Sequence, residues 1–145
     1  MKIETIFEMW NEDSKIDKTN LSEESIKTPS LHNKYIQILF HEKAVLKKYE
    51  SEYKVLRLQK YEFYTQGHTQ ETKDMGWQLP SIGKILKNDV NQYLEADSDL
   101  IKLNLKIGIQ HEKVSVLESI IDSLNKRTFV IKNSIEFQKF QLGAT

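Results

Sequence analysis

The segment from residue 54 to residue 67 interleaves basic with aromatic side chains. The side chains in it that could do chemistry are Lys54, Arg57, Lys60, Tyr61 and Tyr64. Single-stranded nucleic acid is bound by cations that neutralise phosphates and by aromatic faces on which unstacked bases lie. A second interpretation is a solvated helix face whose aromatic residues belong to the core. Spacing alone favours the second interpretation, because Phe63 lies on the apolar stripe of the predicted helix.

One long helix, from residue 28 to residue 64, is predicted to position these side chains. Thr28 offers a capping hydroxyl, and Pro29 suits the first helical position, where no amide hydrogen is needed. Apolar residues then recur with the spacing of one helix face as far as Phe63. The opposite side carries four cations within less than a quarter turn: Lys43, Lys47, Lys54 and Arg57. We expect these cations to contribute to the same binding surface.

Charge is balanced over the whole chain but is unevenly distributed along it. The 145 residues include 21 basic and 21 acidic side chains. Residues 31–64 and 100–145 each hold seven basic and four acidic residues, whereas residues 1–30 and 65–99 each hold three more acidic than basic residues. Association follows the local electric field, so a neutral chain can still present a basic face to a polyanion.

The residue types of catalytic and metal sites are scattered or absent. Cysteine is missing, so the chain has no disulfide, thiol nucleophile or thiolate metal site. The four histidines stand apart from one another, and no phosphate-binding glycine loop, GxSxG motif or zinc-protease motif occurs. No apolar run approaches the ~18–20 residues that a membrane span needs. We therefore expect no enzymatic activity, no cofactor, no metal and no membrane partner.

The chain is predicted to form one helical domain over residues 1–145. Its expected parts are a short N-terminal segment at 1–27, the long helix at about 28–64, a loop at about 65–81 and C-terminal helices at about 82–142. In the loop, Trp77 is expected to fill a local apolar gap. Within the C-terminal part, Asp97 or Ser98 is expected to cap a short break, so the carboxylates there are interpreted as capping groups.

A heptad seam in the C-terminal part predicts coiled-coil-like packing. Its thirteen positions are Leu100, Leu103, Ile107, Gln110, Val114, Leu117, Ile121, Leu124, Thr128, Ile131, Ile135, Gln138 and Leu142. Packed antiparallel against the long helix, this seam gives an all-α fold. So thin a fold leaves apolar side chains without a partner inside one subunit, so a homo-oligomer is expected. The residues expected to hold it are Phe129, Ile131, Ile135 and Phe140.

Several blocks of the sequence, taken in order, carry a family resemblance. They are Ile16 to Leu21, Leu31 with Lys34-Tyr35, Lys60 to Tyr64 before a glycine, and Arg127 to Lys132 followed by Ile135, Phe140 and Gly143. Together they resemble the UvsY family, the recombination mediators of T-even-like tailed phages. The resemblance implies a small helical protein that forms a ring-like homo-oligomer and binds single-stranded DNA. The resemblance favours DNA contact as the role of the basic and aromatic residues at the end of the predicted long helix.

The resemblance also implies partners and a setting. In that family the protein loosens the hold of the single-strand-binding protein on DNA and helps to load a RecA-like recombinase. A phage-encoded protein of this kind works in the host cytoplasm. The family's motif has a lysine and an arginine two residues apart; Lys60 stands at the arginine position and Leu58 at the lysine position. Arg57 is therefore expected to replace the missing lysine.

Two other functions fit the helical pattern. A structural or assembly oligomer without DNA binding would have the same heptad seam. A regulator that acts only through a protein partner would have no affinity for DNA. The cluster of basic and aromatic residues favours DNA binding over both.

Overall fold

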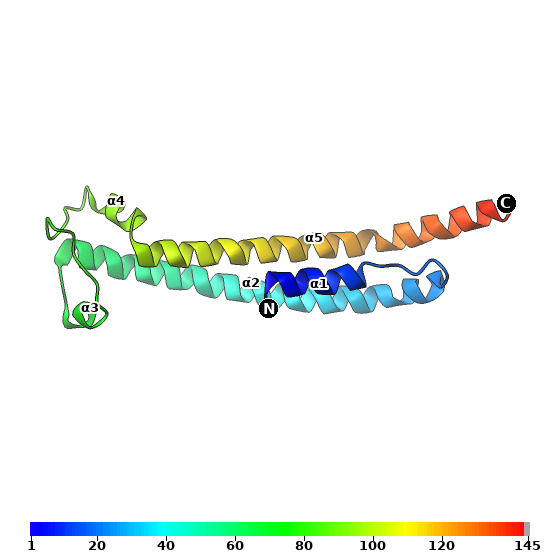
Figure 1. Ribbon diagram of the computed structural model, residues 1–145, viewed down its shortest axis with the longest axis horizontal. Coiled ribbons are helices and arrows are strands. Elements are labelled where there is room, and N and C mark those ends of the chain that lie inside the picture. The colour runs from blue at the N-terminus through cyan, green and yellow to red at the C-terminus, as the bar shows by residue number, and fades with distance from the viewer. Residues whose placement is uncertain (144–145) are drawn as a thin grey trace. The chain divides into compact units, whose positions relative to one another are not determined.

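The computed structural model describes residues 1–143, and every regular element in that range is an α-helix. The elements are α1 (Ile3–Asp13), α2 (Leu21–Gln66), α3 (Gln70–Asp74), α4 (Val90–Glu95) and α5 (Ser98–Gln141), as Figure 1 shows. The predicted all-α class is confirmed. Among the described helices, none combines the length and the apolar character needed to cross a membrane.

The chain packs as two compact units. The first unit comprises Met1–Lys43 and His111–Thr145, and the second comprises Ala44–Gln110. Each unit contains one segment of α2 and one segment of α5. The site predicted from the sequence therefore lies mainly in the second unit.

The α2 helix begins at Leu21 and not at Thr28, so Pro29 lies inside it. An internal proline removes a backbone hydrogen bond and disfavours a helix. The Arg127 guanidinium spans this turn: it donates to the Glu24 carbonyl oxygen at 3.0 Å, to the Glu24 carboxylate at 2.6 Å and to the Thr28 hydroxyl at 3.1 Å. These bonds hold the turn in place, and they come from a residue 103 positions away along the chain.

Helix α1 packs against α2 within the first unit (Figure 1). The Trp10 ring meets the Tyr35 ring edge-on, with 5.4 Å between centroids. The Tyr35 hydroxyl donates to Asp13 Oδ2 at 2.7 Å, and Lys34 Nζ donates to the same oxygen at 2.6 Å. Burial, together with the hydrogen bond to Asp13, raises the pKa of Tyr35, so the hydroxyl stays a donor at physiological pH.

In the first unit α2 and α5 run antiparallel. Glu24 pairs with Arg127, whereas Glu42, later in α2, pairs with Lys113, earlier in α5. The buried part of the heptad seam here consists of Val114, Leu117, Leu124 and Ile131. Arg127 is buried in place of the neighbouring seam residue Thr128, because it reaches the Glu24 carboxylate.

In the second unit α2 and α5 are again antiparallel. Lys106 lies over the Tyr49 ring, whereas Lys60, later in α2, pairs with Asp99 near the start of α5. The core of this unit is a cluster of Phe63, Tyr64, Ile85, Val90, Leu94 and Leu100. Trp77 packs against this cluster, which confirms its predicted role as an anchor for the loop.

The helix predicted from residue 82 does not form at that position. Gly83 has φ of +80°, a left-handed conformation that interrupts a right-handed helix, and α4 begins only at Val90. Ile82 is 72% exposed, but Ile85 is buried and donates its N–H to the Tyr64 carbonyl oxygen at 2.8 Å. The segment before α4 is thus irregular, but it is tied to the end of α2.

Candidate nucleic-acid interface

Three of the predicted cations, Lys47, Lys54 and Arg57, are exposed on α2 in the second unit. Their spacing of seven and three residues puts them on one side of the helix, and we call these three the basic face of α2. Among the residues that the structure describes, neither lysine has an ion-pair or hydrogen-bond partner. Arg57 Nη2 donates to Asn91 Oδ1 at 3.2 Å, which steadies the guanidinium at the surface.

Lys43, the fourth cation predicted on this helix, is the last residue of the first unit's α2 segment. Its Nζ lies 3.9 Å from Glu118 Oε1, and the two side chains are about half exposed. An exposed ion pair of this kind contributes only ~0–1 kcal/mol. Lys43 is therefore free to exchange its carboxylate for a phosphate.

Lys60 is only 4% exposed, so the expectation of a solvent-facing cation at this position is wrong. Its Nζ lies 2.8 Å from Asp99 Oδ2, 3.2 Å from Asp97 Oδ2 and 3.8 Å from the centre of the Trp77 ring. The two carboxylates compensate a charge that burial would otherwise make costly. A phosphate cannot take their place without taking this part of the core apart.

The two tyrosines expected to stack on bases are differently placed. Tyr64 is 8% exposed and donates its hydroxyl to Asp97 Oδ2 at 2.6 Å, so its ring belongs to the core and the expected open face is absent. Burial, then the hydrogen bond to Asp97, raises the pKa of Tyr64. Tyr61 is half-buried and packs against the core cluster of the second unit.

Asp97 joins these groups and caps α5, as predicted. Its Oδ1 accepts from the backbone N–H groups of Asp99 and Leu100, both at 3.0 Å, while its Oδ2 contacts Tyr64 and Lys60. Burial by itself acts to raise the pKa of Asp97, but the Tyr64 hydroxyl, the Leu100 amide and Lys60 together lower it below its ordinary value. The network fixes the end of α2 against the start of α5.

Acid is expected to weaken the second unit through Asp97. Since its folded-state pKa is depressed, its contribution to stability is complete above the unfolded-state pKa of about 3.9 and is lost as pH falls through the lower folded value. Thermal unfolding by circular dichroism between pH 7 and pH 3 should show a shallower pH dependence for Asp97→Asn than for the parent. Parallel curves would contradict this role.

Phe40 is a candidate contact that the sequence interpretation missed. It is 76% exposed on α2 and lies three residues before Lys43, in the first unit. An exposed aromatic ring beside a lysine has the two properties that single-strand binding uses. The signal was present in the sequence, since Phe40, Lys47 and Lys54 follow one another at intervals of seven residues.

Comparison with known protein families identifies the family to which this chain belongs. The profile of the family described as "Recombination, repair and ssDNA binding protein UvsY" matches residues 9–144, nearly the whole chain. The chain belongs to the UvsY family. It is thus a member of a family of recombination, repair and single-stranded-DNA-binding proteins.

Crystal structures of the bacteriophage T4 recombination mediator protein UvsY share this fold. The lattice type IV structure has a TM-score of 0.81 and 19% identity, covering 97% of this chain and 99% of that chain. The type II structure has a TM-score of 0.79 and 22% identity over 98% of both chains, and the type I structure 0.78 and 20% over 94% and 98%. At such identities the likeness shows the fold alone. No curated protein gives a significant match.

The two positions predicted to correspond to the family's basic motif differ in exposure. Lys60, expected at the arginine position, is buried, and Leu58, expected at the lysine position, is 59% exposed. Arg57, one residue earlier, has its guanidinium at the surface. This arrangement supports the hypothesis that Arg57 replaces the missing lysine.

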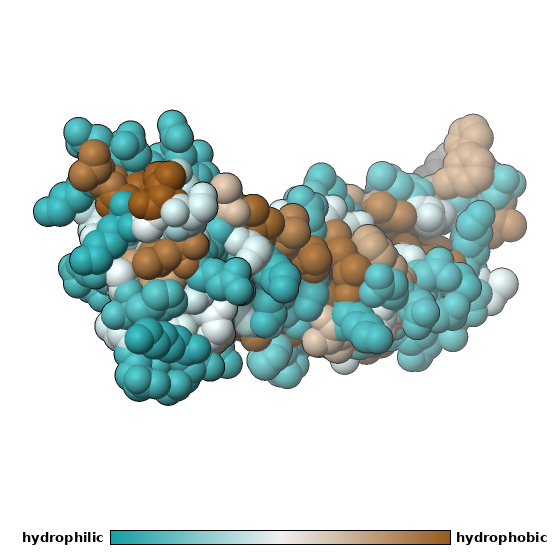
Figure 2. Space-filling model, turned by 60° about the vertical axis from the view of Figure 1, so that its left-hand side comes forward, coloured by the Kyte–Doolittle hydropathy of each residue, from teal (hydrophilic) through white to brown (hydrophobic). Residues whose placement is uncertain are grey.

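The residues expected to hold UvsY-like subunits together fall into two groups. Phe129, Ile135 and Phe140 are 67%, 37% and 77% exposed, so they are available to a neighbouring subunit. Ile131 is 2% exposed and already belongs to the core of its own chain, so it leaves almost no surface for a neighbouring subunit. Hydrophobic side chains reach the surface in several patches of the face shown in Figure 2. The described residues contain no cluster that could hold a metal ion.

Proposed function

We propose that this chain is a recombination mediator that binds single-stranded DNA without sequence preference and promotes loading of a RecA-like recombinase in place of a single-strand-binding protein. The observation that carries the proposal is the basic face of α2, whose lysines have no ion-pair or hydrogen-bond partner within residues 1–143. Lys43 and Phe40, on the first unit's segment of α2, are proposed as further contacts. The proposed setting is the cytoplasm of a phage-infected host.

The chemistry of this surface suits a flexible strand better than a duplex. Lysine and arginine side chains on one helix side can follow a flexible phosphate backbone, and their contacts to phosphates carry no sequence information. A few cations give weak, salt-sensitive binding for one subunit. A homo-oligomer that one strand contacts several times raises the effective concentration and binds far more tightly.

The mediator role is tested on DNA coated with a single-strand-binding protein. Strand-dependent ATP hydrolysis by a RecA-like recombinase should start sooner when the full-length protein is added to the coated strand. On naked strand the gain should be small, because no bound protein has to be displaced. An unchanged lag on the coated strand would contradict the mediator role without bearing on DNA binding itself.

Phe40→Ala is expected to weaken binding to an oligothymidylate while leaving its salt dependence unchanged. Loss of one stacked base corresponds to about 1–3 kcal/mol, or roughly 5- to 150-fold in affinity, and stacking releases few ions. Fluorescence anisotropy should show that the parent prefers oligothymidylate to an abasic strand of equal length and that the variant does not. Phe7→Ala, which removes an exposed ring of α1, is the matched control. A preference that survives Phe40→Ala would rule out stacking at this position.

Removing two exposed rings from the end of α5 is expected to reduce the size of the assembly. Phe129→Ala with Phe140→Ala exposes no core residue, since both side chains are more than two-thirds solvent-accessible at 67% and 77%. Sedimentation velocity should give smaller species for the double variant at unchanged helix content. A parent protein that sediments as a monomer at micromolar concentration would refute the proposed homo-oligomer.

A further inference from the structure

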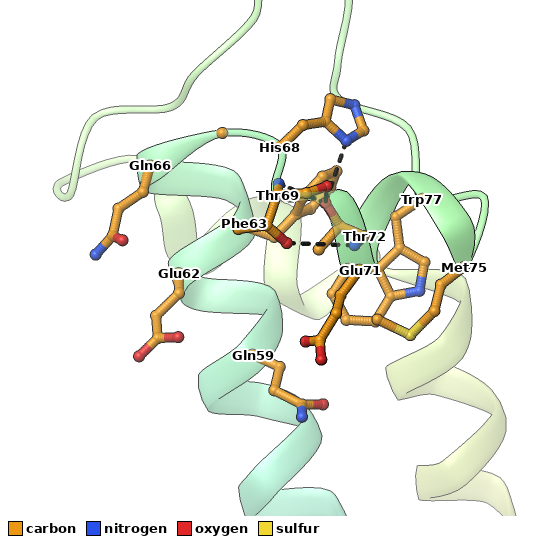
Figure 3. Close-up of a pocket in the computed structure, with 11 residues that line it drawn as sticks. Gln59, Glu62, Phe63, Gln66, His68, Thr69, Glu71, Thr72, Met75 and Trp77 are labelled. Carbon is orange, nitrogen blue, oxygen red and sulfur yellow. Dashed lines mark hydrogen bonds between the residues drawn. The ribbon is translucent and has the colours of Figure 1, made fainter.

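A pocket of about 260 Å³ opens between the last turns of α2 and the loop that carries α3, entirely within the second unit (Figure 3). It lies away from the basic face of α2. Gln59 and Glu62, which line it, each follow a basic-face residue by five positions, which is about 140° around the helix. A strand bound along the basic face would leave this pocket open to another molecule.

The polar rim of the pocket is acidic. Glu62 and Glu71 contribute carboxylates, Gln59 contributes an amide, and no lysine or arginine is among the lining residues. In Figure 3 the Glu71 carboxylate extends into the space beside Gln59. Among the residues that the structure describes, neither carboxylate has an ion-pair partner. Such a rim repels a phosphate and attracts a cation.

Two aromatic rings and a methionine thioether form the walls of the pocket. Phe63 is 2% exposed and forms the floor, Met75 is 53% exposed, and the Trp77 ring meets the Phe63 ring edge-on at 5.4 Å. The Trp77 ring also receives the Lys60 ammonium, whose charge the two aspartates compensate. A planar guanidinium stacks well on an indole, and a thioether adapts to its edge.

The loop around the pocket is held in a fixed conformation. Thr69 and Thr72 cap α3 reciprocally, each side chain bonded to the other residue's backbone N–H. The backbone N–H of Trp77 donates to the Thr72 carbonyl oxygen at 3.1 Å. This bond follows a turn in which Gly76 has φ of +75°. A ligand that enters therefore loses little affinity to the ordering of this segment.

A second hollow adjoins the pocket along α2. It measures about 370 Å³, is lined by Val55 and Leu56 together with Lys48, Ser51 and Glu52, and shares Gln59 with the pocket. Val55 is 58% exposed, so the hollow presents apolar surface. A site with an acidic aromatic pocket beside an apolar hollow matches a peptide in which a basic residue is followed by an aliphatic one.

We propose that this pocket binds the arginine or lysine side chain of a protein partner, with a neighbouring aliphatic side chain in the hollow. The guanidinium or ammonium pairs with Glu71 and lies against Trp77 (Figure 3). Glu62, whose side chain points to the other side of α2 in this view, adds to the negative potential at the rim. This gives the protein a protein-binding side of α2 in addition to the basic face. The inference goes beyond the proposed function and does not depend on DNA binding.

The test uses the full-length chain with Trp10→Phe. Since the sequence has two tryptophans, this substitution leaves Trp77 as the single one. Its fluorescence is titrated with acetyl-Leu-Arg-Leu-amide and with the same peptide carrying citrulline, which keeps the shape and loses the charge. We expect a saturable change with the arginine peptide and an affinity about tenfold lower with citrulline, since a charge-assisted hydrogen bond is lost.

Two variants make the result specific. Glu62→Gln with Glu71→Gln should abolish the difference between the two peptides, whereas Glu4→Gln with Glu8→Gln, exposed on α1, should preserve it. Circular dichroism should give equal helix content for all forms. The proposal is overturned if the citrulline peptide binds the parent equally well, or if the first variant keeps the parent's difference in affinity between the two peptides. It is also overturned if a pentathymidylate competes for the same site, since the pocket would then belong to DNA.

Discussion

Replacing Lys60 by methionine is expected to destabilise the second unit by ~3–5 kcal/mol, because the change leaves a buried carboxylate without its cation. The side chains of Lys60 and Asp97 are 5% and 4% exposed, so water cannot compensate the lost partner. The change also removes the cation from the Trp77 ring. Chemical denaturation followed by tryptophan fluorescence measures the effect. Lys54→Met, on an exposed lysine of the same helix, should shift stability by less than ~0.5 kcal/mol.

A second substitution separates charge from packing in this network. Lys60→Met combined with Asp97→Asn removes both charges, and replacing a buried ion pair by groups without charge is often close to neutral. The double variant should therefore recover part of the stability lost in Lys60→Met. If Lys60→Met unfolds at the same denaturant concentration as the parent, the Lys60 ammonium does not stabilise the buried Asp97 carboxylate.

Removing the basic face of α2 is expected to have the largest effect on DNA binding. For each subunit that the strand contacts, Lys47→Ala, Lys54→Ala and Arg57→Ala together should lower the slope of log affinity against log salt by about 2, at roughly 0.7 per phosphate contact on single strands. In an oligomer the loss is repeated at every subunit that the strand contacts, so affinity should fall by well over tenfold. Anisotropy titrations with oligothymidylate at several salt concentrations measure both quantities.

The control for this variant carries the same change in net charge. Lys126, Lys132 and Lys139 are exposed on α5 in the first unit, and their replacement by alanine also removes three cations. This control should keep the parent's salt slope if the contact is local to α2. Equal losses in the two triple variants would show that DNA responds to overall charge and not to the basic face.

Much of the fold followed from sequence periodicity. The heptad spacing correctly predicted that Val114, Leu117 and Leu124 are buried, because one helix side repeats with that period. The start of α2 was misplaced, since the Arg127 bonds that hold the turn before Pro29 come from the far end of the chain. Such a contact has no local signature in the sequence.

The site was predicted less well than the fold, for a related reason. Steps of three residues rotate by about 60° short of a turn, so Lys60 lies about 120° around the helix from Lys54. The sequence gives this angle but does not show that Asp97, Asp99 and Trp77 cover that side. Lys60 and Tyr64 were therefore predicted to bind DNA, whereas both are buried in the core of this structure.

The central claim, that this UvsY-family chain binds single-stranded DNA electrostatically through α2, is tested most directly by the salt dependence of the parent protein. Affinity for an oligothymidylate should fall with a log–log slope of about 3 for each subunit that the strand contacts, since Lys43, Lys47, Lys54 and Arg57 each contribute roughly 0.7. A duplex of equal length should bind more weakly at every salt concentration. An affinity that does not change with salt, or that is equal for strand and duplex, would contradict the claim.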